Sequence, residues 1–267
     1  MAVKEFQKTI WDFYRKNGRK LPWRETKDPY KILVSEIMLQ QTQVVRVLPK
    51  YEEFIKTFPD FFVLSQASLS SILRIWSGLG YNRRALYLQK IARLIEIEHK
   101  GKFPQDPKIL EQFPGIGTAT ARSIVVFSFN VPYAFIETNI RRVFIHRFFE
   151  GQTDVGDKEL CPFIRQTLDQ KNPRQWYYAL MDYGSYLAKQ VENPNQKSKH
   201  YTKQSKFKGS LRQTRGNILK IISKEKRVFY NKLFSEFQDK EDLFKKALAQ
   251  LEREGFLQIT KRIIKLR

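Results

Sequence analysis

The sequence predicts a mainly α-helical fold followed by a small C-terminal domain of helices and strands. Two observations carry this prediction. Apolar residues recur at helical spacing through about the first 190 residues, with short connections rich in Pro, Gly and Asp. The last dozen residues instead alternate apolar and polar side chains, as strands do. With 267 residues, 42% of them apolar, the chain can bury a substantial core.

Successive amphipathic segments define the helical part. Residues 29–46 show the pattern best, because a proline suited to a first helical turn opens a run that is apolar at helical period. In residues 3–17, Phe6, Ile10 and Trp11 lie near the same spacing. The remaining helices are expected at 47–57, 68–76, 84–99, 107–112, 118–128, 139–149, 157–169 and 174–190.

Residues 191–210 are polar, basic and nearly free of aliphatic side chains, so they are expected to form a linker. Beyond them, residues 216–223, 230–237 and 243–257 are expected to be amphipathic helices, and residues 255–267 a β-hairpin. Three helices followed by a two-stranded wing is the order of a winged helix. Residues 211–267 are therefore predicted to be winged-helix-like, although small unrelated α+β domains give the same pattern.

The net charge of +22 indicates a polyanionic partner. The charge is unevenly distributed, because residues 197–267 alone carry +13. A basic surface that only keeps the protein soluble is the alternative. It is less favoured, because acidic residues serve solubility at least as well.

The composition argues against several kinds of site. The single cysteine, Cys161, cannot form an internal disulfide or supply a cysteine-rich zinc or iron–sulfur site. The three histidines are far apart in the sequence, so no metal held by side chains is expected. No stretch approaches the ~20 apolar residues that a membrane span needs. The N-terminus lacks the pattern of a secretion signal, so a cytoplasmic location is expected.

The segment FPGIGTATARSIVVF, residues 113–127, places Gly115 and Gly117 on either side of Ile116, between two expected helices. Glycines permit a tight hairpin and leave room for a phosphate. The N–H groups that open the next helix, from Thr118, suit an anion. The PGIG form is that of a helix-hairpin-helix clamp on a DNA backbone; an ordinary glycine-containing turn between helices is the alternative.

Glu36 lies among apolar residues in LVSEIMLQQTQVVRV, residues 33–47. A carboxylate in such surroundings is costly unless it is protonated, paired or exposed in a cleft. Burial favours the protonated form, which a general acid requires. Gln40 and Gln41, one turn further on, could reach base edges or an unpaired strand. The alternative is a carboxylate on a solvated helix face, and spacing alone favours that alternative.

A second carboxylate, Glu137, lies directly ahead of an expected helix that starts near Thr138 or Asn139. Glycoside cleavage pairs an acid with a carboxylate that stabilises an oxocarbenium-like centre. Glu137 is the candidate for this second role. The alternative is an acid that only interacts with the helix dipole.

These segments occur together with five further motifs, which are LPWR at 21–24, WSGLGY at 76–81, KFPQ at 102–105, NIRRV at 139–143 and ALMDYG at 179–184. In this order and at these intervals they resemble the helix-hairpin-helix base-excision DNA glycosylases, and most closely the MutY-type adenine glycosylases. The resemblance covers residues 5–190 or so. Matching so many segments in order is far more specific than any single motif.

The resemblance implies a two-lobed all-α fold, with lobes at residues 28–130 and at 1–27 plus 131–190, that grips duplex DNA and flips the target base into a pocket. Its site residues carry over by position. Glu36 protonates the departing adenine, Arg19, Trp23 and Arg24 line the base pocket, and Gln40, Gln41 and Tyr81 fill or wedge the duplex. Gly115, Ile116, Gly117 and Thr118 hold phosphate through the backbone, often with a monovalent cation, and Arg83 and Arg84 contact phosphate.

Departures from the family surround the second carboxylate. Glu137 stands where the family has its catalytic aspartate, and Thr138 where it has a glycine. The extra methylene shifts a carboxylate by ~1.5 Å, and misplacement by ~1 Å can cost about 10²-fold in rate. Thr138 is suited to cap the following helix, which would free Glu137 to extend toward the sugar.

Other departures concern cofactors and chemistry. The four cysteines that hold an iron–sulfur cluster in the family are absent after ALMDYG, so no cluster is expected. No segment resembles the C-terminal domain with which adenine glycosylases recognise 8-oxoguanine. Ala119 stands where bifunctional relatives have the lysine that forms a Schiff base with the sugar.

The sequence therefore predicts a monofunctional DNA N-glycosylase that uses water and no cofactor, and that removes adenine opposite 8-oxoguanine or guanine in duplex DNA. Thymine or uracil opposite guanine is the alternative substrate. A catalytically reduced scaffold that binds DNA is the alternative from another class, favoured by the changes at Glu137 and Thr138. A DNA-associated monomer is expected.

Overall fold

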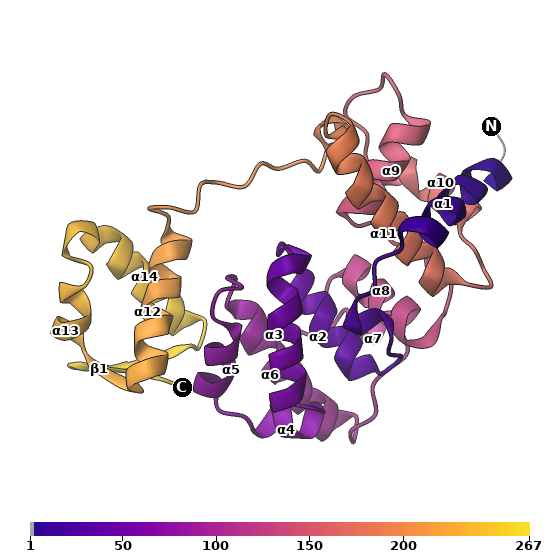
Figure 1. Cartoon of the computed structure of the whole chain (residues 1–267). Coiled ribbons are helices and arrows are strands. Elements are labelled where there is room, and N and C mark those ends of the chain that lie inside the picture. Colours follow the sequence, from indigo (N-terminus) through magenta and orange to yellow (C-terminus); the bar gives the residue numbers. More distant parts are fainter. Residues whose placement is uncertain (1–2) are drawn as a thin grey trace. The chain divides into compact units, whose positions relative to one another are not determined.

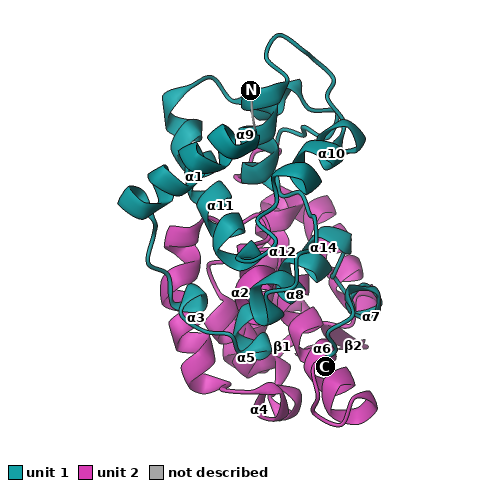
Figure 2. Ribbon diagram, turned by 90° about the vertical axis from the view of Figure 1, so that its right-hand side faces the viewer, with its two compact units in different colours: residues 1–32, 104–203 teal, residues 33–103, 204–267 magenta. Residues whose placement is uncertain are grey.

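The computed structural model describes residues 3–267 (Figure 1). Most of these residues are helical, and the chain forms two compact units (Figure 2). Unit 1 contains the residues up to Ile32 and residues 104–203, and unit 2 contains residues 33–103 and 204–267. Helix α2 (Pro29–Leu39) begins in unit 1 and ends in unit 2. Within the described residues, no helix is long and apolar enough to cross a membrane.

Unit 1 is built around helix α11 (Pro173–Gln190), which packs against α1 (Val3–Asn17) and α9 (Thr138–Phe148). Buried aromatic rings join the three helices, because the ring of Phe6 lies 5.4 Å from that of Phe144 and 6.0 Å from that of Trp176. Such rings each remove roughly 150–250 Å² from water and dominate the energetics of a core. The other elements are η1 (Pro22–Arg24), α7 (Pro107–Leu110), α8 (Thr118–Phe129), α10 (Asp157–Thr167) and η2 (Pro194–Lys197).

Helices α9 and α11 approach each other closely at Gly184. A Cβ atom at Gly184 would lie 2.5 Å from the backbone oxygen of Asn139 and 2.7 Å from its Cβ, so only glycine fits. Nη1 of Arg142 also donates to the carbonyl of Gly184 at 2.8 Å. This contact fixes the first turn of α9, directly after Glu137.

Unit 2 contains a set of helices that precede the C-terminal segment. Helices α4 and α5 both pack against α6, and α3 packs against α5. Buried Trp76 closes this core, with its ring 6.1 Å from that of Phe54. The bounds are α3 (Val44–Thr57), α4 (Phe61–Gln66), α5 (Leu69–Trp76) and α6 (Arg83–Glu98).

Residues 211–267, the C-terminal module, complete unit 2. Their elements are α12 (Leu211–Glu225), β1 (Arg227–Phe229), α13 (Tyr230–Ser235), η3 (Gln238–Lys240), α14 (Glu241–Arg253), β2 (Leu257–Thr260) and β3 (Ile263–Leu266). The strands form an antiparallel sheet in the order β1-β3-β2. Its inner face, with Val228 and Ile264 buried, packs against helices of the module. Helix α12 rests on α5, where Oγ of Ser70 donates to the carbonyl of Ser223 at 3.1 Å.

The three helices and the hairpin expected in the module are present. Strand β1 was not predicted, because three residues are too few for a recognisable alternation. The helix–strand–helix–helix–strand–strand order fits the winged-helix prediction, which otherwise stays a prediction.

The structure differs from the helices expected at residues 29–57. One helix was expected over residues 29–46, but α2 ends at Leu39 and α3 begins at Val44. Between them, Gln41 takes a left-handed conformation with a φ of 53°, which a continuing helix does not tolerate. Helix α4 was not predicted.

The compact units also divide the chain differently from the two lobes expected at residues 28–130 and at 1–27 plus 131–190. Residues 104–130 group with unit 1. The reason is that α8 packs on α11, where Nη2 of Arg174 donates to the carbonyl of Ser128 at 3.0 Å.

Part of the expected linker at residues 191–210 is packed against unit 1. Asn195 in η2 is buried, and its Nδ2 donates to the carbonyl of Thr138 at 3.1 Å. Residues 201–206, in contrast, form neither helix nor strand and are exposed, as a linker should be.

Candidate functional site

Glu36 lies on α2 in a segment that is otherwise inside the protein. From Ile32 to Met38 every residue except Glu36 is buried, and Glu36 is half-buried. Glu36 is thus the most accessible residue of this stretch of α2, and its role as an acid stays a prediction. Its neighbours along the helix are buried, and the Glu36 side chain itself keeps some access to solvent.

Arg84 closes the C-terminal end of α2 from within unit 2. Its side chain is buried, and Nη1 donates to the carbonyls of Ile37, Met38 and Gln40 at 2.8, 2.7 and 2.7 Å. Nη2 donates to Oγ1 of Thr42 and to the carbonyl of Gly80, both at 3.0 Å. These carbonyls include orphans that every helix end leaves unpaired.

The surroundings of Arg84 overturn its expected role. Burial lowers the pKa of the Arg84 guanidinium to about 10. Both of its terminal nitrogens are engaged inside the unit, so Arg84 does not present a donor to a phosphate. It ties the loop after α2 to the turn at residues 79–81.

Gln41 and Tyr81, two of the residues expected to wedge DNA, have unusual backbone conformations. Their φ angles are 53° and 47°, and for side chains of this size a left-handed backbone is rare and often marks a functional site. Nε2 of Gln204 donates to Oε1 of Gln41 at 3.2 Å and to the hydroxyl of Tyr81 at 2.6 Å. Nη1 of Arg212 donates to the same hydroxyl at 2.6 Å. Sequence reasoning missed Gln204 and Arg212, which lie more than a hundred residues along the chain.

Arg83, expected to contact phosphate, is half-exposed and pairs with Glu254 of the C-terminal module. Arg215 on α12 grips both carboxylate oxygens of Glu254, and its Nη1 lies 2.8 Å from Oε1. Burial acts to raise the pKa of Glu254, but the hydrogen bonds and charges of Arg215 and Arg83 outweigh it and lower the pKa to about 2. This carboxylate therefore joins α6 to the module.

In unit 1, Asp182 accepts hydrogen bonds from two of the residues expected to line a base pocket. Nη1 and Nη2 of Arg24 each donate to one of its oxygens at 2.8 Å, and Nε of Arg19 donates at 2.6 Å. Burial acts to raise the pKa of Asp182, but the arginines outweigh it and lower the pKa. Trp23 is buried and the side chain of Arg24 is 7% exposed, whereas the side chain of Arg19 is 35% exposed. The ALMDYG motif contained Asp182, but nothing in its pattern indicated this partnership.

The glycine hairpin joins α7 to α8. Gly115 has a φ of 79°, which favours glycine, and the amide of buried Ile116 donates to the carbonyl of Phe113 at 3.2 Å. Gly117 is the N-cap of α8, and no atom lies within 4 Å of the place that a Cβ would take. The hydroxyl of Thr118 donates to Glu111 at 3.1 Å. The start of α8 is therefore open and without a side-chain cap.

Glu137 is the N-cap of α9. Its Oε1 accepts the backbone N–H groups of Asn139 and Ile140, each at 2.8 Å, and its Oε2 accepts Nδ2 of Asn139 at 3.2 Å. The expectation that Thr138 could cap the helix is wrong, because Thr138 is already the first helical residue. Removal from water raises the pKa of Glu137 more than these donors lower it.

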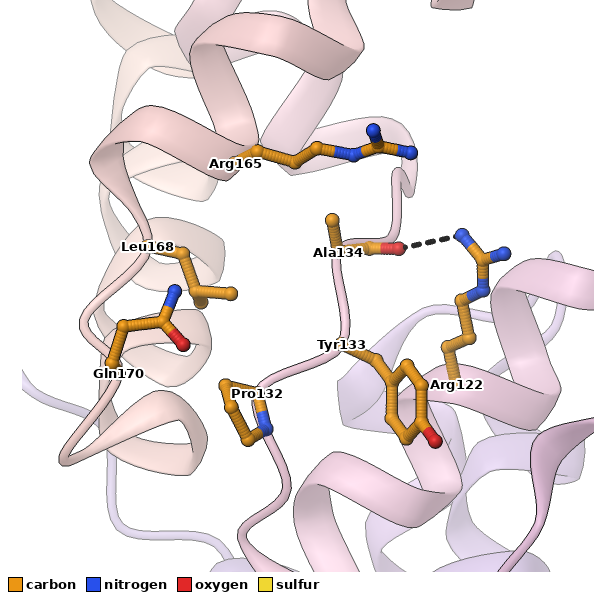
Figure 3. A pocket seen from close by; sticks show the side chains of 7 residues that line it. All are labelled: Arg122, Pro132, Tyr133, Ala134, Arg165, Leu168 and Gln170. Atoms are coloured by element: carbon orange, nitrogen blue, oxygen red, sulfur yellow. Dashed lines mark hydrogen bonds between the residues drawn. The ribbon is translucent and has the colours of Figure 1, made fainter.

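A cavity of about 370 Å³ lies in unit 1 beside the loop that leads to α9 (Figure 3). Arg122, Tyr133 and Arg165 are among its lining residues, and Nη1 of Arg122 donates to the carbonyl of Ala134 at 2.9 Å. None of the site residues predicted from the sequence, all within the described part of the chain, lines this cavity. The hydrogen bond from Arg122 to Ala134 stabilises the loop ahead of Glu137.

The predicted site residues are divided between the two units. Unit 2 carries Glu36, Gln40, Gln41, Tyr81, Arg83 and Arg84, and unit 1 carries Arg19, Trp23, Arg24, Glu137 and the hairpin residues 115–118. Within residues 3–267, no group of three His, Cys, Asp or Glu side chains could hold a metal ion.

Comparisons of sequence identify relatives of the chain. Residues 34–164 match the model of the HhH-GPD superfamily base excision DNA repair protein. The chain is 38% identical over 192 residues to the adenine DNA glycosylase of Buchnera aphidicola subsp. Baizongia pistaciae, covering 70% of this chain and 54% of that protein. It is 39% identical over 145 residues to the adenine DNA glycosylase of Mycobacterium tuberculosis (strain H37Rv), covering 54% and 47%. The chain thus spans about half the length of the curated relatives it matches.

Solved structures share the fold. The structure of a thermostable thymine-DNA glycosylase superposes with a TM-score of 0.62 at 28% identity, covering 68% of this chain and 86% of that one. A trapped endonuclease III–DNA covalent intermediate superposes with a TM-score of 0.60 at 17% identity, covering 70% and 87%, which indicates the fold alone. Residues 34–164 of the chain thus form a domain of the HhH-GPD superfamily of base excision DNA repair proteins.

Proposed function

We propose that the chain is a monofunctional DNA N-glycosylase of base excision repair that removes adenine opposite 8-oxoguanine or guanine. One observation carries the proposal. Glu36 is the one residue between Ile32 and Met38 that is not buried, so a carboxylate stands in an apolar helix with access to solvent. The identity to adenine DNA glycosylases supports adenine as the base.

Glu36 acts as the general acid. It gives its proton to the adenine ring as the bond between the base nitrogen and C1′ breaks, and the bonding electron pair leaves with the base. The sugar is left as an oxocarbenium ion, whose charge the ionised form of Glu137 offsets. Water then adds at C1′ and releases a proton.

Glu137 performs this role while it remains the cap of α9. Its two oxygens face different donors, since Oε1 accepts two backbone N–H groups and Oε2 accepts only the side chain of Asn139. Oε2 therefore has a further lone pair for an electrostatic role. Because the raised pKa of Glu137 must be exceeded before the carboxylate ionises, acid slows the reaction.

The residue at the position of a Schiff-base lysine supports a hydrolase without strong strand nicking. Ala119 offers no amine, so the oxocarbenium ion is captured by water. The hairpin at residues 115–118 holds a phosphate through backbone N–H groups, because α8 begins without a side-chain cap and Gly117 leaves the approach open. The same hairpin backbone would hold a monovalent cation, which would neutralise part of the phosphate charge.

Single-turnover base release tests the proposal on duplexes that carry adenine opposite 8-oxoguanine, adenine opposite guanine, and thymine or uracil opposite guanine. Glu36→Gln is expected to abolish release and to keep DNA affinity. Glu52→Gln, at an exposed position of α3, is the matched control and is expected to keep the wild-type rate.

Each other result has a definite meaning. Release by Glu36→Gln at the wild-type rate overturns the assignment of the acid. Release of thymine or uracil without adenine replaces the substrate. Intact DNA binding without release from any duplex leaves a scaffold protein and overturns the enzyme.

A further inference from the structure

The sheet of the C-terminal module has one outer face that no helix of the module covers. The strand register places Arg227, Lys265 and Gln258 side by side in one row, and Phe229, Ile263 and Thr260 in the next. These six residues, here called the basic sheet face, point away from the buried face of Val228 and Ile264. Five of them are exposed and Ile263 is half-buried.

Two like charges stand directly opposite each other on this face. Arg227 of β1 pairs with Lys265 of β3, and like charges in this position destabilise a sheet. No acidic residue lies between Gly255 and Arg267 to compensate them. Further cations flank the face at Lys226, Lys261, Arg262 and Arg267, all exposed. A folded domain that retains such repulsion has a surface matched to an anion.

An exposed aromatic side chain accompanies the charges. Phe229 is 62% exposed and lies one row from Arg227 and Lys265. Gln258 and Thr260 add side chains able to donate hydrogen bonds to phosphate oxygens. Cations and polar donors gathered on a single face form the combination that contacts nucleic-acid backbones.

Helix α14 of the module lacks this character. It carries Lys245, Lys246 and Arg253, balanced by Glu241, Asp242 and Glu252. A second helix after a turn is the element that a helix-turn-helix inserts into the major groove. Here that helix has no net charge, whereas the strands carry Arg227 and Lys265 and no acidic residue.

We propose that the basic sheet face, and not α14, binds the phosphate backbone of duplex DNA. The identification of DNA as the polyanion rests on the proposed function of the chain. Arg227 and Lys265 neutralise phosphates, Gln258 and Thr260 donate to phosphate oxygens, and Phe229 packs against deoxyribose. Because the module is joined to α5 and α6 by Ser70 and by the Arg83–Glu254 pair, this binding acts directly on the unit that carries Glu36 and Tyr81.

The test measures the affinity of the full chain for an undamaged duplex as the salt concentration changes. Each phosphate neutralised contributes about 0.9 to the slope of log affinity against log salt. Arg227→Gln with Lys265→Gln is therefore expected to lower the slope by about 1.8. Between about 50 and 200 mM salt, the wild type should lose about 12-fold more affinity than this variant.

Lys240→Gln with Lys246→Gln is the matched control. Both lysines are exposed on the η3–α14 side of the module, and the pair removes the same formal charge. Its slope is expected to stay close to that of the wild type. Thermal unfolding gives a second readout, because the Arg227 and Lys265 variant relieves repulsion and should melt at or above the wild-type temperature.

The outcomes separate this inference from the proposed function. Equal slopes for the two double variants overturn the inference, and a larger loss for the Lys240 and Lys246 variant transfers the DNA contact to α14. If the Arg227 and Lys265 variant shows a lower slope with duplex RNA but not with duplex DNA, the partner is RNA, and this result also overturns the inference. Binding to undamaged DNA does not require base release, so a failed glycosylase assay leaves this test valid.

Discussion

The replacement of Arg84 by methionine tests how the end of helix α2 is held. Methionine keeps much of the volume and removes the charge and every donor. Five acceptors that now lie within 3.0 Å of the guanidinium nitrogens lose this donor, and these are the carbonyls of Ile37, Met38, Gln40 and Gly80 and Oγ1 of Thr42. The carbonyls of Ile37 and Met38 would then lack a side-chain donor, whereas those of Gln40 and Gly80 would keep Oγ1 of Thr42 and Nε1 of Trp76.

The expected loss of folding stability follows from two opposing contributions. Hydrogen bonds to a charged group each contribute about 1.5–3 kcal/mol, so five at the lower end stabilise by about 7 kcal/mol. Burial opposes this, since the fall of the Arg84 pKa from 12.5 to about 10 corresponds to roughly 3.4 kcal/mol. The expected net loss is about 4 kcal/mol, which agrees with the ~3–5 kcal/mol typical of a disrupted buried network.

Thermal unfolding followed by circular dichroism measures the effect. A loss of about 4 kcal/mol should lower the melting temperature of unit 2 by about 10 °C or more. Arg93→Met is the control on the same helix. Arg93 is exposed and makes one hydrogen bond, from Nε to the carbonyl of Ser65 at 3.1 Å, so its loss should stay within about 1 kcal/mol. Melting temperatures within about 3 °C of each other for the two variants would refute this account of Arg84.

Three further variants test other contacts. Gly184→Ala should destabilise unit 1 by about 1–3 kcal/mol in urea unfolding, because its Cβ meets the backbone of Asn139. Arg212→Ala removes a charged donor and a guanidinium 5.6 Å from the centre of the Tyr81 ring, and should slow single-turnover base release about 5-fold with little change in melting temperature. Glu137→Gln should remove a pH dependence of stability. Because the pKa of Glu137 is raised, the folded state holds this proton more tightly than the unfolded chain does. Wild-type stability therefore falls as the pH rises above the ordinary pKa of 4.5. The stability of the glutamine variant relative to the wild type should rise over the same pH range.

Controls make each result interpretable. Gly216→Ala in α12 meets no atom within 4 Å and has no left-handed backbone, so it should be neutral or stabilising. Lys220→Ala, exposed on the same helix as Arg212, should leave base release unchanged. A stability difference between wild type and Glu137→Gln that is constant from pH 4 to pH 8 would contradict the raised pKa.

Much of the fold was predictable because it is local. The period of apolar residues located most helices, and the glycines of the hairpin at residues 115–118 marked the turn before α8. The end of α2 was not predictable, because residues 40–43 contain no Gly or Pro to mark a break and apolar residues resume at Val44. The carbonyls at the end of α2 are bonded by Arg84, which the tertiary packing of α6 brings there.

The site was predictable only in part, for the same reason. The position of Glu36 between buried neighbours follows from the helical pattern. A basic pair after a glycine-rich turn reads as a phosphate contact, and no local signal distinguishes exposed Arg83 from buried Arg84. At the start of α9, both Glu137 and Thr138 are able to cap a helix. The extended backbone at Glu137, with φ −121° and ψ 176°, decides between them.

The make-up of the basic sheet face also bears on how the protein would search for its target. Its cations and short polar side chains suit phosphates, which are the same at every base pair, and the helix that would read base edges carries no net charge. Contacts of this kind let a protein slide and hop along DNA, because no position is held more tightly than the next. The module would thus lengthen each encounter with undamaged DNA and leave the choice of where to stop to the helices around Glu36.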